Sequence, residues 1–333
     1  MKRHHSSRFL VLPAALLLVA FSAATSPAPA DPLVVTAVRW QNPPTGLDDP
    51  AWQRVPAVEV AVKGHDSFAE REVPVAIRAA YTEDRIYLLL RWPDPTRSVT
   101  KNSWTFDGVG WTHLPGNEDR IALLFEITRI NKFATRGCAA VCHSPPDAPE
   151  DQWKLATHND DESGDLWHWQ AARSAVYGYA DDTWLTVAGE PSGAYRKTGR
   201  RSDTGEGGDV KNETEDLSRP RYLQDPAKGP SVPGFLLFEE AVPITDSMVF
   251  DAGTVIPYRL PVRPGGSRFD VKAESRYADG AWTVLLSRKL NTGHGDDVVF
   301  DPARRYSFAM AVFDDSGNNH SKATEPLTLR FAH

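Results

Sequence analysis

Two cysteines and a histidine form the clearest chemical group in this sequence of 333 residues. Cys138 and Cys142 are separated by three residues, His143 follows directly, and the chain contains no other cysteine. Two thiols can add to the vinyl groups of a porphyrin, and an adjacent imidazole can then bind its iron from the same short turn. A spacer of two residues is more common than the three found here. The pattern predicts one covalently attached haem c, with His143 as an iron ligand.

Other uses of the same residues stay open. In an oxidising compartment the two cysteines could form a disulfide, although closing so short a loop adds little stability. A structural zinc site needs four ligands, so here it would depend on distant histidines. Two cysteines are too few for a disulfide framework in a chain of this size.

A haem iron that only transfers electrons generally has a second axial ligand. His168 lies between Trp167 and Trp169, so in a strand its side chain points away from both tryptophans. Met310 lies in the middle of an apolar run, where a core methionine is the default interpretation. Spacing alone does not choose among the candidates, which are His65, His113, His158, His168, His294, His320, His333, Met248 and Met310.

Aromatic residues are dense just after the cysteines. Aromatic walls can keep water away from a haem, but an ordinary hydrophobic core uses tryptophan equally well. The run therefore supports the haem prediction without establishing it. Its members are Trp153, Trp167, Trp169, Tyr177, Tyr179 and Trp184.

Short stretches rich in Val, Ile, Leu and aromatic residues must position these groups. Each is bounded by Pro, Gly, Asp or Asn, which end strands and begin turns. Asp279-Gly280 is a strong hairpin dipeptide. Long helical periodicity is absent, so the sequence predicts an all-β fold, an antiparallel β-sandwich. The predicted strands are 33–38, 73–80, 86–92, 120–125, 271–277, 282–286, 306–313 and 327–331.

Two longer stretches interrupt the predicted strands. Residues 127–183 contain the cysteines and the aromatic run. Residues 189–234 are rich in Gly, Pro, Ser, Arg and Asp, a composition typical of a surface loop. Strand signals resume after each stretch, so we expect a single domain over 31–333 in which these insertions form a haem pocket.

Residues 1–30 have the order of a secretory signal peptide. A basic start is followed by an apolar run over 9–21 and by small residues at 28–30. This run is too short to span a bilayer, and no later stretch is long and apolar enough to do so. We therefore expect a periplasmic protein without a membrane span after cleavage.

The chain is acidic. Its formal net charge is -7, and since residues 1–30 hold three Lys or Arg and no Asp or Glu, residues 31–333 carry -10. Such a charge is poorly suited to nucleic acid or to an anionic membrane surface. It favours a protein partner with a basic docking face.

Several motifs, spread over nearly the whole chain after residue 30, have a familiar pattern. They are 137–144, 164–173, 178–182, 47–52, 87–95, 288–293 and 308–314. Together they resemble the ethylbenzene-dehydrogenase-type haem-binding domain, which is the fold of the haem γ subunit in periplasmic molybdenum enzymes of the dimethyl-sulfoxide-reductase superfamily. The resemblance implies a β-sandwich that holds one haem at its edge, and it includes part of the second insertion, at Tyr195 and 219–222.

The sequence departs from these γ subunits at both haem ligands. Their haem is b-type and is held by a methionine and a lysine. Cys142-His143 stands where they have the methionine, and His320 stands where they have the lysine. The resemblance thus implies His143 and His320 as the axial pair and Trp167, His168, Trp169 and Arg173 near the haem. Alternative second ligands are Met310, His158, Lys289 and Lys322.

Together these observations predict a single-haem c-type cytochrome that transfers electrons and is not itself an enzyme. A redox protein, such as a molybdenum enzyme or a membrane cytochrome, would be its partner. One alternative is a secreted module that binds carbohydrate through exposed tryptophans, of which the chain has ten. That reading leaves Cys142-His143 unexplained. Another is a haem enzyme with an open iron position, but no paired general acid and base stands out.

Overall fold

The computed structural model describes residues 33–64, 72–142, 154–188, 197–228, 235–317, 320–323 and 325–332. The expected signal peptide at 1–30 lies outside these ranges, and so does His143. Within the described ranges, no helix has the length and apolar character needed to cross a membrane.

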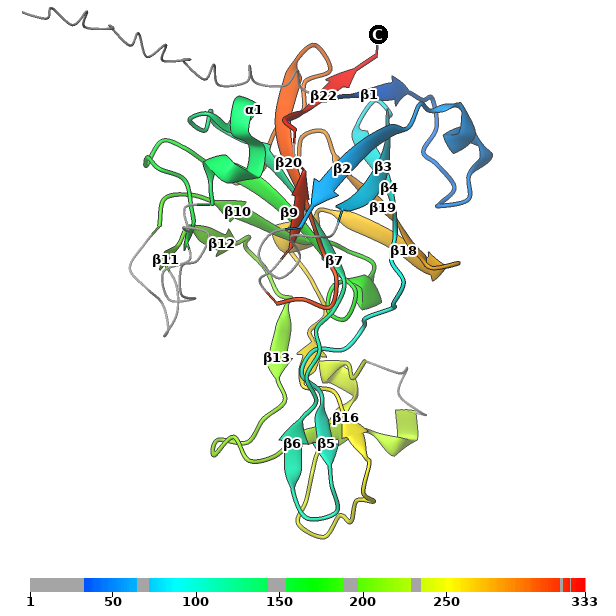
Figure 1. Cartoon of the computed structure of the whole chain (residues 1–333), viewed down its shortest axis with the longest axis vertical. Coiled ribbons are helices and arrows are strands. Elements are labelled where there is room, and N and C mark those ends of the chain that lie inside the picture. The colour runs from blue at the N-terminus through cyan, green and yellow to red at the C-terminus, as the bar shows by residue number, and fades with distance from the viewer. Residues whose placement is uncertain are drawn as a thin grey trace, which may run out of the picture.

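Thirteen of the described strands form one sheet that folds over into the two layers of a β-sandwich (Figure 1). One layer contains β7 (Arg120–Glu126), β9 (Gly164–Gln170), β10 (Asp181–Leu185), β12 (Arg200–Ser202), β20 (Arg305–Phe313), β21 (Ser321–Ala323) and β22 (Leu327–Phe331). The other contains β1 (Leu33–Arg39), β2 (Val58–Lys63), β3 (Glu72–Tyr81), β4 (Arg85–Pro93), β18 (Lys272–Ala278) and β19 (Ala281–Lys289).

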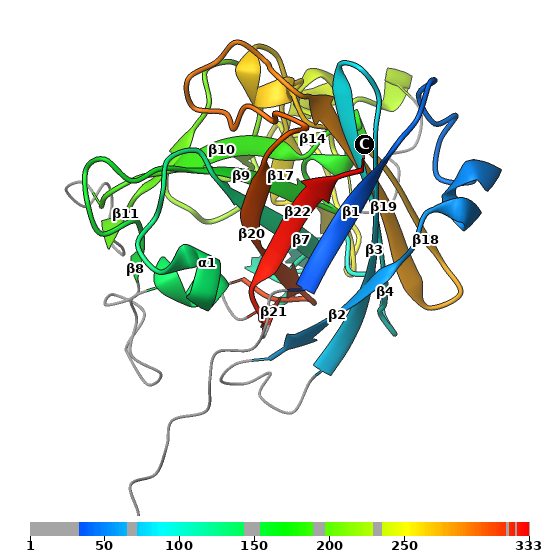
Figure 2. The same ribbon diagram turned by 90° about the horizontal axis from the view of Figure 1, so that it is seen from above.

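The strand order is β12-β10-β9-β7-β20-β21-β2-β3-β4-β19-β18, and β22 and β1 form a second link between β20 and β3. Figure 2 shows the two layers from above, with β22 and β1 side by side where the sheet folds over. Strand β1 runs parallel to β22 and to β3, and the other pairings of this sheet are antiparallel. The predicted antiparallel β-sandwich is confirmed.

All eight predicted strands are present, with ends that differ from the prediction by three residues at most. They are β1, β3, β4, β7, β18, β19, β20 and β22. The hairpin between β18 and β19 turns at Asp279 and Gly280, whose φ angles are 53° and 65°. Two successive positive φ values are the conformation that Asp-Gly favours in a two-residue hairpin loop.

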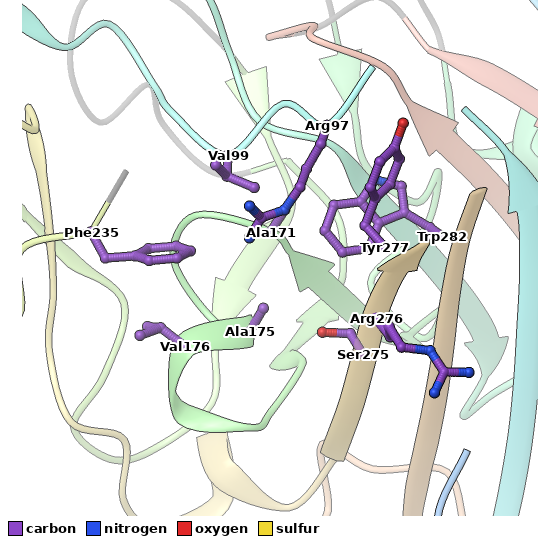
Figure 3. Close-up of a pocket in the computed structure, with 10 residues that line it drawn as sticks. All are labelled: Arg97, Val99, Ala171, Ala175, Val176, Phe235, Ser275, Arg276, Tyr277 and Trp282. Atoms are coloured by element: carbon purple, nitrogen blue, oxygen red, sulfur yellow. The ribbon is translucent and has the colours of Figure 1, made fainter. Parts of the chain in front are cut away.

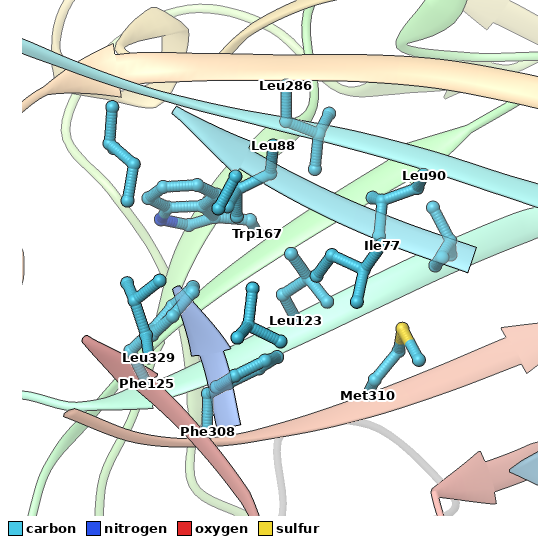
Figure 4. Close-up of a cluster of buried hydrophobic side chains, with 14 of the residues drawn as sticks. Ile77, Leu88, Leu90, Leu123, Phe125, Trp167, Leu286, Phe308, Met310 and Leu329 are labelled. Atoms are coloured by element: carbon cyan, nitrogen blue, oxygen red, sulfur yellow. The ribbon is translucent and has the colours of Figure 1, made fainter. Parts of the chain in front are cut away.

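The main hydrophobic core fills the space between the two layers (Figure 4). Ile77 and Leu88 enter it from one layer, and Leu123, Trp167 and Met310 enter it from the other. These residues alternate along their strands with residues on the opposite faces, as the two-residue period of a strand requires. The core therefore fixes which side of each strand faces away from it.

The sequence suggested that residues 127–183 interrupt the sheet, but in the structure they also contribute strands to it. They carry β9 and β10, which continue the first layer beyond β7. All seven residues of β9 are buried, so both of its faces are covered. A strand covered on both faces shows no alternation of polar and apolar residues, and Asp165, His168 and Gln170 further obscure its β character.

A smaller lobe lies beside the sandwich and has its own hydrophobic cluster (Figure 1). Trp104, Leu236, Ile256 and Tyr258 are buried members of that cluster. The lobe therefore extends beyond the predicted insertion at 189–234. Its strands are β5 (Trp104–Phe106), β6 (Trp111–His113), β13 (Asp209–Lys211), β14 (Tyr222–Gln224), β15 (Ala241–Pro243), β16 (Val255–Ile256) and β17 (Arg259–Pro261).

The remaining described elements are short. Strand β8 (Lys154–Leu155) pairs with β11 (Lys197–Thr198). The α-helix is α1 (Phe133–Arg136). The 3-10 helices are η1 (Pro50–Arg54), η3 (Gly137–Ala140), η5 (Ala175–Tyr177), η6 (Pro226–Lys228), η7 (Phe238–Glu240) and η8 (Ser267–Phe269).

Candidate functional site

The two cysteines lie in one tight turn that follows α1. Cys138 belongs to η3, and the amide of Cys142 donates a hydrogen bond to the Cys138 carbonyl at 3.2 Å. An isolated bridge to Leu155 fixes the far end of the turn. Both cysteines are half-buried free thiols in the structure. His143, the next residue, lies outside the described residues.

The environment of Cys138 is apolar. It packs against a cluster that includes Leu124, Leu166 and Ala309, and burial raises the pKa of its thiol to about 12. Such a thiol stays protonated at neutral pH. Because the thiolate is the form that binds zinc or attacks an oxidant, this environment does not favour a metal-thiolate or redox-sensing role.

The cysteine turn covers the outer face of the first layer, which is the side of β7, β9 and β20 that points away from the main core. Figure 1 shows α1 beside β20. Side chains on one face recur at every second residue, so neighbouring rows across the strands are about 7 Å apart. Cys138 packs on one row, and His168 belongs to the next. The rows are Leu166, Leu124 and Ala309, and then His168, Ala122 and Ala311.

His168 is the buried polar group of this face. Its side chain is 4 % exposed, and its Nε2 has no hydrogen-bond partner among the described residues. The other ring nitrogen, Nδ1, lies 3.3 Å from the Gln170 amide nitrogen. Burial lowers the pKa of His168 well below its usual value, and the charges of Arg200 and Arg120 lower it further. The imidazole is therefore neutral, which is the form that binds a metal.

His320 and His168 both lie against one aromatic ring, that of Phe313. The centre of the Phe313 ring is 4.9 Å from that of His320 and 5.7 Å from that of His168. Phe313 pairs with Arg120 across the sheet, and the Arg120 guanidinium lies 4.0 Å from the centre of the Phe313 ring. The two histidines and Cys138, which are far apart in the sequence, thus belong to the same outer face.

A buried cation, Arg120, and a half-buried one, Lys101, lie close to His168, and the sequence did not single them out. Arg120 is 5 % exposed and donates to the carbonyls of Ser316 and Gly317, while its Nε has no partner among the described residues. Lys101 donates to the Asn117 side chain at 2.8 Å. Burial lowers the pKa of Arg120 to about 9 and that of Lys101 to about 7.

Such cations are costly unless a negative charge accompanies them. Arg200 also lies near His168, and its guanidinium is 3.7 Å from the Asp181 carboxylate, a long ion pair. The charges of Arg173 and Arg120 lower the pKa of Lys101, and that of Glu118 raises it, so positive charges outnumber negative ones around Lys101. The arrangement suits a ligand that carries acidic groups. Only the strand register reveals this group of cations, because its members are remote from one another in the sequence.

Other residues that the sequence placed near the haem lie elsewhere. Trp167, Trp169 and Met310 are at most 1 % exposed and belong to the main core, on the opposite face of β9 and β20. As the sequence predicted, His168 points away from the two tryptophans. Met310 is separated from Cys138 by the sheet itself.

Arg173 has a structural environment. Its guanidinium pairs with Glu118 at 2.5 Å and with Asp209 of β13 at 3.1 Å. Arg259 of β17 also pairs with Asp209, at 2.7 Å. These ion pairs join the smaller lobe to the end of β9, and the two carboxylates compensate the charge of Arg173.

A separate cavity of about 390 Å³ lies near the β18–β19 hairpin (Figure 3). Trp282, Tyr277 and Phe235 give it aromatic walls, and Arg97 reaches over it. Neither the cysteines nor His168 and His320 line this cavity. It is therefore distinct from the outer face that carries the cysteine turn.

Comparison with known proteins identifies the family of the chain. The family model described as ethylbenzene dehydrogenase matches residues 49–325. The chain therefore belongs to the ethylbenzene dehydrogenase family. No curated protein matches the sequence.

Solved structures with a similar fold include a family 9 carbohydrate-binding module from Caldicellulosiruptor kristjanssonii. In its complex with glucose the identity is 7 %, the TM-score is 0.38, and the match covers 91 % of this chain and 96 % of that one. In its complex with cellotriose the identity is 6 %, the TM-score is 0.37, and the coverage is 90 % and 95 %.

Proposed function

We propose that this protein is an electron-transfer member of the ethylbenzene dehydrogenase family with one haem attached to Cys138 and Cys142. The main support for this proposal comes from the outer face of the first layer. On it the cysteine turn lies beside a neutral, buried imidazole whose Nε2 has no partner among the described residues. A cofactor that reacts with thiols and binds next to a neutral imidazole would fit this face.

The other residues of this face fit a haem. Ala122 of β7 and Ala309 and Ala311 of β20 present small side chains on this face, which suits a flat apolar ring. The propionates of a haem are carboxylates, and they would add negative charge beside the buried Arg120 and the half-buried Lys101, whose pKa values burial lowers even though Glu118 raises them. Charge complementarity therefore supports a haem more than a neutral ligand.

The iron ligands in this proposal are His143 and His320. His143 follows Cys142 directly, and the two cysteines are held in one turn. His320 reaches the same face through its contact with Phe313. His168 is the other imidazole of this face, and it replaces Met310 as the principal rival because Met310 lies in the main core.

A bound haem would supply one-electron oxidation and reduction of its iron. The chain's own contribution would be to hold the ring, exclude water from it and compensate its acidic groups. With two strong axial ligands no position would be left for a substrate, which fits a carrier or a subunit of a redox complex. Its partner would be a redox protein with a basic docking face, in the periplasm if residues 1–30 act as a signal peptide.

A visible spectrum of the full chain, produced in cells that attach haem c, tests this proposal. We expect a pyridine haemochrome band of the c type that stays with the polypeptide through acid–acetone extraction. Cys138→Ala should reduce covalently bound haem at least about tenfold. Ser163→Ala, a change outside the cysteine turn, is the control and should retain it. A haem that extracts completely from the unaltered chain would contradict covalent attachment.

The alternative of a carbohydrate-binding module makes a different prediction. It needs exposed aromatic platforms, but of the nine tryptophans that the structure describes, six are buried and three are half-buried. If the purified protein contains no haem and binds oligosaccharides, this alternative replaces the electron-transfer proposal.

A further inference from the structure

A second group of buried side chains lies where β9 and β10 approach the connection between β19 and β20. Carboxylate oxygens of Asp165, Asp182 and Asp297 all lie within 4.8 Å of one another. Oxygens of Asp203, Asp296 and Asp297 meet the same condition. Since Asp297 belongs to both groups, the five aspartates form one cluster, contributed by four separate segments of the chain. We call it the aspartate cluster.

Most of the aspartate cluster is buried but incompletely hydrogen-bonded. Asp182 is 0 % exposed, and neither of its carboxylate oxygens has a partner among the described residues. Asp203 and Asp297, which are 4 % and 2 % exposed, each have one oxygen without a hydrogen-bond partner there, and so does Asp165. Buried oxygens without donors are costly, so their presence together points to a positively charged ligand.

Two side chains of the chain's own approach this cluster with nitrogen atoms: Arg288, and His294, whose Nδ1 lies 3.7 Å from Asp297 Oδ2. Arg288 is 0 % exposed and donates to Asp165, to Asp297 at 3.0 Å and to the Val298 carbonyl. A single guanidinium does not balance five carboxylates, and these bonds leave Asp182 and Asp203 without a donor from Arg288. Burial and the neighbouring Asp296 and Asp297 carboxylates raise the pKa of Asp203 to about 8, as expected for crowded acids that lack a counter-ion.

We propose that the aspartate cluster binds a calcium ion. Its donors are carboxylate oxygens, the ligands that hard divalent cations prefer, and it contains no thiol. Calcium accepts six to eight oxygens in flexible geometry, whereas magnesium requires near-octahedral geometry and usually keeps several waters. Several buried carboxylates from the protein therefore suit calcium better.

The ion would convert repulsion among the aspartates into attraction. It would also join β9 and β10 to the connection that leads into β20 and thereby stabilise the strands whose outer face carries Cys138 and His168. The calcium site does not depend on the haem proposal, because the aspartate cluster uses the core-facing side of β9 and β10 and none of the haem ligands.

Calorimetric titration of the full chain with calcium chloride, after removal of bound metal with EDTA, tests this site. We expect one ion per chain and a higher melting temperature with calcium than with EDTA. Asp203→Asn should weaken binding at least about tenfold. Asp251→Asn removes the same charge from an exposed position outside the cluster and should leave the affinity unchanged.

Asp296→Asn provides a second variant at a half-buried position if Asp203→Asn does not fold. Loss of calcium binding in either folded variant supports the site. Absence of binding by the unaltered chain overturns the proposal, as does equal affinity in the unaltered chain and the folded variant. Magnesium bound as tightly as calcium would overturn the assignment of the ion. Each of these results can be read without haem, so the two proposals fail separately.

Discussion

The two faces of β9 are both buried, but they are built differently. On the core face, Trp167 and Trp169 pack against aromatic and aliphatic side chains of the opposite layer. On the outer face, His168 lies beside Ala122, and an apolar row that contacts Cys138 runs next to it. Large side chains close the first face, whereas small residues and buried polar groups form the second. Burial alone therefore does not distinguish a core from a site, and side-chain volume and charge are needed as well.

Truncating a side chain on the core face should reduce the free energy of unfolding more than any other change proposed below. Trp169 is 0 % exposed and its ring centre lies 4.9 Å from that of Trp282. Trp169→Ala would leave a large cavity and should reduce the free energy of unfolding by about 3–5 kcal/mol, as measured by denaturant titration. Trp184→Ala, at a half-buried position of β10, is the matched control and should cost clearly less. Equal losses would contradict the role of the core face as the main source of stability.

The acids beside the core should make stability depend on pH. Burial raises the pKa of Asp94 to about 6 and that of Asp119 to about 7, and repulsion from Asp94 adds to the shift of Asp119. Because the folded state prefers the protonated forms, this contribution is complete below about pH 4 and is lost as the pH rises through 6 and 7.

We expect the free energy of unfolding to fall by on the order of 2 kcal/mol between pH 4 and pH 7.5 because of Asp94 and Asp119. Urea unfolding at each pH measures this change. Asp94→Asn removes one titrating group and its effect on the other, so its stability should change less over this range. The aspartate cluster titrates in both proteins and cancels from the comparison. Parallel curves for the two proteins would show that Asp94 and Asp119 do not cause the dependence.

Replacing His168 or His320 by methionine should have the smallest effect on stability, about 1 kcal/mol or less in the free energy of unfolding. Replacing the histidine that binds the iron should nevertheless change the midpoint potential of the haem. If His320 is the second axial ligand, His320→Met should raise the midpoint potential, because a thioether ligand favours the reduced iron more than an imidazole does. His168→Met should leave the potential nearly unchanged. Redox titration followed by the visible spectrum distinguishes the two, and the reverse result would assign the ligand to His168.

The sequence by itself determined the β-sandwich, eight of its strands, the turn at Asp279-Gly280 and the family resemblance. Those features depend on local periodicity, turn chemistry and short motifs, which neighbouring residues express directly. It also predicted that His168 points away from Trp167 and Trp169, since that follows from the two-residue period of a strand.

Only the tertiary structure placed β9 and β10 in the sheet, moved Met310 to the far side from Cys138, and gathered Arg120 and Lys101 near His168. It also brought the five members of the aspartate cluster together. These relations depend on which strands pair and in what register, and register is set by long-range packing that no local stretch of sequence contains. A site assembled across strands is therefore visible only after the chain has folded.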